Sequence, residues 1–217
     1  MGTDNLFHKR KVRTASELTR RKARREPYAK VLIVCEGEKT EPNYFNGLRD
    51  CYGLNSANVE VCGDCGTDPI GIVKYAKRRY KEERDAGDAF DRVYCVFDKD
   101  SHHSYNNAKE SIRTAKPKNV YFAITSVPCF EYWLLLHFDD TTKPFRRCED
   151  VITVLKNHMP GYNKGQRDTF SFLINKLDAA KKNAHKAIQA ATSGDTDNPT
   201  TQVHELVEYL QNIKTIR

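Results

Sequence analysis

The sequence predicts an α/β protein in which short buried strands alternate with amphipathic helices. Continuous apolar runs of strand length occupy residues 31–35, 92–97 and 120–125. Runs without alternation are typical of parallel strands covered on both faces. Helical patterns separate them, as in the βαβ units of a doubly wound sheet. At 217 residues the chain has room for one such domain and a smaller addition.

The elements of the expected sheet follow in order along the chain. After the first strand, Thr40 and Pro42 mark the start of a helix. Residues 56–62 alternate between polar and apolar and predict a second, less buried strand. A helix opens at Pro69 and carries apolar side chains at helical spacing as far as Tyr80. The strand at 92–97, a modest helix at 108–115 and the strand at 120–125 complete this part.

After Pro128 the pattern is helical only. We expect a short helix around Trp133, with the indole in the core, and further helices at 149–158, 169–191 and 201–214. A turn-rich break at 193–199 separates the last two. The expected organisation is therefore a basic N-terminal arm at 1–27, an α/β domain at 28–127 and a helical extension at 128–217 packed on it.

The net charge of +7 lies entirely in residues 1–25 of the N-terminal arm. Residues 1–25 hold nine Lys or Arg against two acidic residues, and the rest of the chain is balanced. Such a run is either a solvated tail or a sequence-independent contact with phosphates. In the second case the substrate-binding residues would include Arg20, Arg21, Lys22, Arg24 and Arg25.

The composition is polar, and no apolar run reaches the roughly 18 residues needed to cross a bilayer. The N-terminus also lacks the apolar segment of a secretory signal, so we expect no membrane partner and a cytoplasmic location. Cys35, Cys95 and Cys129 lie in apolar stretches, which favours buried reduced thiols over a disulfide framework. Cys62 and Cys65 form a lone CxxC, which favours an ordinary loop over a zinc site.

Acidic residues follow three of the predicted strands. Glu36 and Glu41 follow the first strand, Asp98 and Asp100 the third, and Glu131 the fourth. Each could be a turn residue, helix cap or ion-pair partner taken singly. The carboxyl ends of parallel strands meet at one edge, however, and clustered like charges cost free energy unless a hard divalent cation compensates them. The set therefore predicts a divalent metal site, whereas His102 and His103 are predicted to be plain loop residues.

Three motifs carry a resemblance to a known family: VCEGEKTEPNYF, CVFDKDSH and PCFEYWLLLHF, in that order. They resemble the RloB-like proteins, a branch of the TOPRIM fold found in bacterial restriction and phage-defence loci. The resemblance spans roughly residues 28–215 and includes the late DNPTT turn. It implies a TOPRIM-like sheet, with Glu36 as the catalytic glutamate and with Asp98 and Asp100 as the aspartate pair that binds Mg²⁺, or Mn²⁺ in its place. Glu41 matches the second acid of the EGxxTE motif and Glu131 the acid of FExW, whereas Val127 stands where the family commonly has Asn.

TOPRIM chemistry is phosphoryl transfer, so the resemblance implies a Mg²⁺-dependent endonuclease that cleaves RNA, tRNA included, or DNA in anti-phage defence. Asp98 and Asp100 would hold the cation, and Glu36 would act as a general base or as a ligand of a second metal. Lys39 is placed to contact a phosphate oxygen. Two alternatives stay open: a non-catalytic nucleic-acid-binding subunit of a defence complex, and a primase-like or nucleotidyltransferase-like enzyme.

The expected partners follow from the same resemblance. Nucleic acid is the first, and an ATPase encoded in the same locus is the second, because the chain has no GxxxxGK motif of its own. Assembly into a homo-oligomer is left open.

Overall fold

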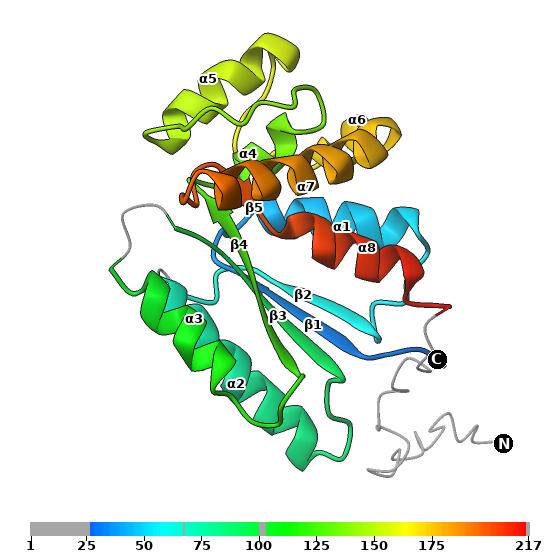
Figure 1. The fold of residues 1–217 in the computed structure, drawn as a ribbon. Helices are drawn as coiled ribbons and strands as arrows, with labels where there is room; N and C mark the ends of the chain where they lie inside the picture. Colours follow the sequence, from blue (N-terminus) through cyan, green and yellow to red (C-terminus); the bar gives the residue numbers. More distant parts are fainter. Residues whose placement is uncertain (1–26, 67, 100–102, 216–217) are drawn as a thin grey trace, which may run out of the picture.

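The sheet has five strands in the order β2-β1-β3-β4-β5, with helices on both faces (Figure 1). The computed structural model describes residues 27–66, 68–99 and 103–215. The strands are β1 (Val31–Cys35), β2 (Val59–Cys62), β3 (Arg92–Asp98), β4 (Tyr121–Val127) and β5 (Thr200–Thr201). The first four are parallel, and β5 is antiparallel to β4. The predicted α/β class is confirmed.

The helices divide between the two faces of the sheet. They are α1 (Thr40–Cys51), α2 (Pro69–Asp85), α3 (Tyr105–Arg113), α4 (Glu131–Leu135), α5 (Cys148–His158), α6 (Thr169–Leu173), α7 (Leu177–Ser193) and α8 (Val203–Asn212), with a 3₁₀ turn, η1 (Ile174–Lys176), between α6 and α7. Helices α2 and α3 cover one face, and α1 and α8 cover the other (Figure 1). Helices α4 to α7 lie toward the carboxyl ends of the parallel strands. None of the helices that the structure describes is long and apolar enough to cross a membrane.

Alternate residues of β1 feed two separate hydrophobic cores. Val31 and Ile33 belong to the larger core, and Leu32 and Val34 belong to the smaller one beneath α2 and α3. The larger core also contains Trp133, which has no exposed surface, so its predicted place in the core is confirmed. Because this core draws residues from both the sheet and the later helices, the site at the strand ends is built on one packed scaffold.

The expectation of helices alone after Pro128 is wrong at one point, because β5 joins the edge of the sheet. Thr201 pairs with Ser126, and their buried hydroxyl oxygens lie 2.9 Å apart. Two threonines carry no strand periodicity, so only the exposed edge of β4 selects this pairing. The helix predicted at 169–191 is likewise divided into α6, η1 and α7.

The prediction that Cys129 is a reduced thiol is also wrong. Cys35 and Cys95 are buried and free, but a disulfide joins Cys129 to Cys148. Apolar context reports burial and not pairing, and the packing of α4 on α5 brings the two sulfurs together. The bond fixes the segment before α4 to the start of α5.

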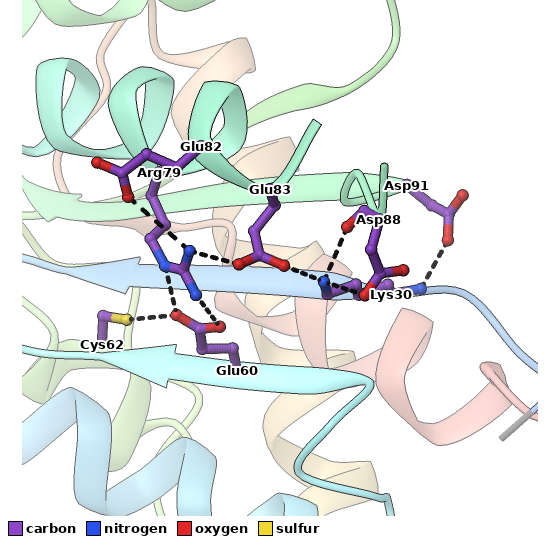
Figure 2. A network of polar contacts seen from close by, with 8 residues as sticks. All are labelled: Lys30, Glu60, Cys62, Arg79, Glu82, Glu83, Asp88 and Asp91. Atoms are coloured by element: carbon purple, nitrogen blue, oxygen red, sulfur yellow. Dashed lines mark hydrogen bonds and ion pairs between the residues drawn. The ribbon is translucent and has the colours of Figure 1, made fainter. Parts of the chain in front are cut away.

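A network of charged side chains lies near the amino-terminal ends of the strands (Figure 2). Lys30 precedes β1 and is only 5% exposed. Its ammonium group donates to Glu83 at 2.5 Å and to Asp88 at 2.7 Å. Arg79 joins Glu83 to Glu60 of β2. The network ties α2 to β1 and β2, so the end of the sheet opposite the acidic residues is fixed by ion pairs.

Candidate functional site

The order of the strands defines a crevice between β1 and β3. Strand β1 has β2 on one side and β3 on the other. The chain therefore moves across the sheet in one direction through α1, from β1 to β2, and in the opposite direction through α2, from β2 to β3. Ligands of open α/β sheets bind at such a switch point, outside the carboxyl ends of the strands. Glu36 follows β1 and Asp98 ends β3, so both residues lie at this position.

Backbone contacts hold these two carboxylates side by side. The pairing of β1 with β3 continues past β1, because the Glu36 N–H donates to the Val96 carbonyl at 3.0 Å. The Glu36 Oε2 in turn accepts from the Asp98 N–H at 3.1 Å. The Asp98 Oδ2 accepts from the Phe130 N–H at 3.1 Å. The carboxylates predicted to meet at the strand ends therefore do so.

A cavity of about 320 Å³ lies at this edge of the sheet. Its lining includes four of the five residues predicted as metal ligands, together with Lys39, which is exposed there. Those four are Glu36, Glu41, Asp98 and Glu131. The other predicted site residues, Asp100, Arg20, Arg21, Lys22, Arg24 and Arg25, lie outside the described residues, as does His102.

Glu41 has a carboxylate oxygen that accepts no hydrogen bond from a described residue. It lies in the first turn of α1 and is 6% exposed, and its Oε2 is buried without a hydrogen-bond partner among the described residues. Gly37 makes room for this carboxylate, since a Cβ atom there would lie 2.0 Å from the Glu41 Oε2. The glycine of the EG turn therefore lets the Glu41 carboxylate occupy this position, and a larger residue would displace it.

Protein groups contact both carboxylate oxygens of Glu131. Its Oε1 accepts from the Tyr162 hydroxyl at 3.1 Å and pairs with the Lys164 ammonium group at 3.3 Å. Its Oε2 lies 3.1 Å from the Cys148 sulfur, which has no proton to donate because it is in the disulfide. Glu131 is only 2% exposed, so its charge is balanced chiefly by Lys164.

Burial and neighbouring acids raise the pKa of two of these residues, Glu41 and Asp98. Burial raises the pKa of Glu41 to about 7, and the charges of Glu131 and Glu36 add to the rise. The pKa of Asp98 is also raised, first by desolvation of its carboxyl group and then by Glu41 and Glu131. Five acidic residues and two lysines line the cavity, so the acids, when ionised, carry more negative charge than the lysines offset.

Sequence reasoning missed the segment 159–166, which supplies Lys164, Gly165 and Tyr162. The Gly165 N–H donates to the Thr40 hydroxyl at 2.9 Å, and its carbonyl accepts from Asn43 at 2.8 Å. Gly165 has φ of +80°, and a Cβ there would come within 2.9 Å of the Lys39 side chain. The Asn-Lys-Gly turn was the only signal, and it does not show where the segment docks.

The DNPTT motif lies outside the lining of the acidic cavity. Asp197 pairs with Lys99, the residue after Asp98, at 2.5 Å. The Asn198 side chain accepts from the Phe145 N–H and donates to the Phe145 carbonyl. The motif therefore anchors the chain on both sides of β4 rather than contributing to the acidic cavity.

The donor set fits a hard divalent cation. Carboxylate oxygens, excess negative charge and a buried oxygen without a partner are the features that such a cation satisfies. Glu36, Glu41 and Asp98 do not come within 4.8 Å of one another as a set. In the described part of the chain only Cys129, Glu131 and Cys148 do so, and two of these form the disulfide. The carboxylates thus surround a cavity rather than a closed coordination sphere.

Fold and site together define an α/β protein with a carboxylate-lined cavity at the switch point of a mainly parallel sheet. The model of the RloB-like protein family matches residues 31–210. The chain therefore belongs to the RloB-like family, as the three motifs indicated. No curated protein and no solved structure matches it.

Proposed function

We propose that this protein is a divalent-metal-dependent nuclease that hydrolyses phosphodiester bonds. One observation carries the proposal: Glu36, Glu41 and Asp98 line one cavity at the ends of β1 and β3, where the Glu41 Oε2 is buried without a partner among the described residues. Three acids so placed raise the free energy of the folded protein unless a cation joins them. The arrangement agrees with the TOPRIM interpretation of the motifs.

Glu36, Glu41 and Asp98, with Asp100, would hold Mg²⁺ or Mn²⁺. When bound, such a cation stabilises the negative charge of a scissile phosphate and lowers the pKa of a coordinated water. Glu131 was expected among the ligands, but its contacts with Tyr162 and Lys164 favour another role. We assign to Glu131 the positioning of Lys164 at the cavity wall.

The protein's own residues would then transfer protons and bind the phosphate. Without the cation the pKa of Glu41 is raised to about 7, so near neutral pH the cation and a proton compete for this carboxylate. Glu36 has the role of general base that the resemblance implies. Lys39 makes no ion pair with another described residue and is exposed at the cavity, so its ammonium group can contact a non-bridging phosphate oxygen.

The proposed substrate is nucleic acid, RNA or DNA, and the proposed setting is anti-phage defence. Membership of the RloB-like family supports both the substrate and the setting. The basic arm supports the substrate, since it can contact the phosphates of a nucleic acid of any sequence. Any use of ATP would come from a partner, because the chain has no P-loop sequence.

The test is cleavage of total RNA and of plasmid DNA by the purified chain with Mg²⁺, Mn²⁺ or EDTA. We expect one pool to be cleaved, with activity lost in EDTA. Asp98→Asn should lower the rate at least 100-fold, in line with the loss of a principal charged group at a catalytic centre. Asp85→Asn, at an exposed aspartate of α2, is the matched control and should cleave like the wild type.

Two outcomes would contradict the proposal. One is an absence of Mg²⁺ or Mn²⁺ binding by calorimetry together with an absence of cleavage. The other is cleavage that Asp98→Asn leaves unchanged. Metal-independent binding of nucleic acid without cleavage would instead favour the non-catalytic subunit.

A further inference from the structure

We propose that a second pocket, beside the acidic cavity, receives one unstacked nucleobase of the substrate. The inference rests on the proposed function and names the part of the substrate that the protein contacts. The pocket has a volume of about 370 Å³ and lies between the end of α5, the segment 159–166 and α6. Phe138, His158, Tyr162, Gln166 and Phe172 are in its lining, and we call it the aromatic pocket.

Flat rings dominate the aromatic pocket. Phe172 is 63% exposed and is the one large hydrophobic side chain exposed among the residues described. The Phe138 and His158 rings stack at 5.3 Å with an interplanar angle of 11°. The Lys176 ammonium group lies 5.1 Å from the Phe138 ring centre. Aromatic side chains with a neighbouring cation are the usual platform on which unpaired bases stack.

A polar atom in the pocket favours a base over an apolar protein segment. The Gln166 Oε1 is buried and has no hydrogen-bond partner among the described residues. An apolar side chain in the pocket would leave this acceptor unsatisfied, as it already is, and would gain nothing from it. The amino or imino group of a nucleobase would supply the missing donor.

The surrounding charge suits a polyanion. Residues 156–176 contain Lys156, Lys164, Arg167 and Lys176 but only one acidic residue, Asp168. Three of these basic residues form no ion pair with another described residue, and Lys164 pairs with Glu131. A positive rim around a stacking surface is the general pattern of sites for single-stranded nucleic acid.

The segment 159–166 joins the aromatic pocket to the acidic cavity. Tyr162 lines the aromatic pocket and donates its hydroxyl proton to Glu131, which lines the cavity. Lys164 and Gly165, a few residues on, line the cavity directly. A base held in the pocket would therefore place its strand beside the proposed cleavage site, and a base inside a duplex could not reach it without being unstacked. The arrangement selects unpaired nucleotides.

The experiment measures binding of fluorescent single-stranded RNA and DNA oligonucleotides, and of the matching duplexes, to full-length Asp98→Asn protein by anisotropy. We expect the single strand to bind more tightly than the duplex. Adding Phe172→Ala should weaken single-strand binding by roughly 5- to 150-fold, which corresponds to the loss when a stacking aromatic is removed. Phe172→Trp should restore binding, whereas Phe172→Leu, which keeps apolar area without a ring, should not.

Each further outcome decides between the proposals. If Phe172→Ala binds single strands as well as its parent does, while the wild type still cleaves, the aromatic pocket is wrong and the nuclease proposal stands. If the wild type neither binds nor cleaves nucleic acid, both are wrong. If Phe172→Ala changes only the oligomeric state measured by light scattering, the surface contacts a second copy and the base pocket is excluded.

Discussion

Glu41 is the residue at which a proposed functional role lowers the stability of the metal-free fold. Its carboxylate is buried and close to other acids, and Gly37 leaves space for it that any larger residue would fill. A group with these surroundings lowers the stability of the metal-free protein at the pH where it ionises. It is therefore the residue at which the metal proposal can be tested without measuring activity.

The pH dependence of stability follows from the raised pKa of Glu41, which is about 7 instead of 4.5. Between these values the folded state binds more protons than the unfolded state, so the stabilisation present below pH 4.5 is lost as the pH rises through 7. For Glu41 the loss amounts to about 3 kcal/mol when complete. Urea unfolding of metal-free protein from about pH 5 to pH 8 should show this fall.

Glu41→Gln is the matched variant for that measurement. Its profile should be shallower than that of the wild type, with the part due to Asp98 remaining, because the pKa of Asp98 is raised as well. Mg²⁺ should restore stability to the wild type above pH 7 and have a smaller effect on the variant. Parallel profiles for the two proteins would show that Glu41 does not titrate in this way.

Gly37→Ala tests whether the space beside Glu41 matters. The added methyl group would lie 2.0 Å from the Glu41 Oε2, so the carboxylate has to move out of its position. We expect Mn²⁺ affinity to fall by about 10- to 100-fold, as when the support of a metal ligand is lost. Calorimetric titration measures it, and Gly161→Ala, where a Cβ meets open space, is the control. Equal affinities in the two variants would remove Glu41 from the metal site.

At the scale of elements, the family motifs have two different roles, one at the cavity and one in holding the sheet together. The motifs after β1 and β3 place carboxylates in the cavity, whereas DNPTT forms a turn and β5, which hold the edge of the sheet. The segment before α4 does both, since the Phe130 N–H contacts Asp98 and Cys129 is bonded to α5. A motif is therefore not evidence of a catalytic role until its contacts are known.

The disulfide between Cys129 and Cys148 predicts how many cysteines can be alkylated before and after reduction. Alkylation of the denatured, unreduced protein should label five of the seven cysteines, and reduction should expose all seven. Reduction should also lower the free energy of unfolding by about 2–4 kcal/mol, because the bond closes a short loop of the unfolded chain. Cys148→Ser should be insensitive to reductant. Seven labels without reduction would show that the bond is absent in solution.

The ion-pair network of Lys30 predicts a loss of stability at the other end of the sheet. Lys30→Met would leave Glu83 and Asp88 without their shared partner in a partly buried setting (Figure 2). We expect the free energy of unfolding to fall by about 2–4 kcal/mol, below the full cost for a completely buried pair. Lys186→Met, which breaks the exposed pair with Asp140, is the control and should change little. Similar effects in the two variants would contradict this account of the network.

At the scale of the whole molecule, the net positive charge and the folded α/β part lie in different segments of the chain. Residues 1–25 of the arm carry the entire net charge of the chain, and the remaining 192 residues, which include the sheet and the cavity, are balanced. The contribution of the arm to polyanion affinity can therefore be removed without altering the described residues of the cavity.

Deleting residues 1–25 should weaken nucleic-acid binding and flatten its dependence on salt. Each phosphate contact that is lost lowers the slope of log affinity against log salt by about 0.7–0.9. Binding curves at several salt concentrations measure it, and an unchanged slope would show that the arm does not contact phosphates. Mg²⁺ affinity should be unaffected, because the described residues that line the cavity all lie in the part that remains.

The sequence by itself determined that strands and helices alternate along the first part of the chain, that Trp133 is buried and that Glu36 lies near Asp98. These depend on local periodicity and on the rule that parallel strands end at one edge, and both are written along the chain. The tertiary structure alone decided the pairing of Cys129 with Cys148, the addition of β5 and the docking of Tyr162 and Lys164 against Glu131. Those contacts join segments by packing, and packing leaves no periodic signal in either segment.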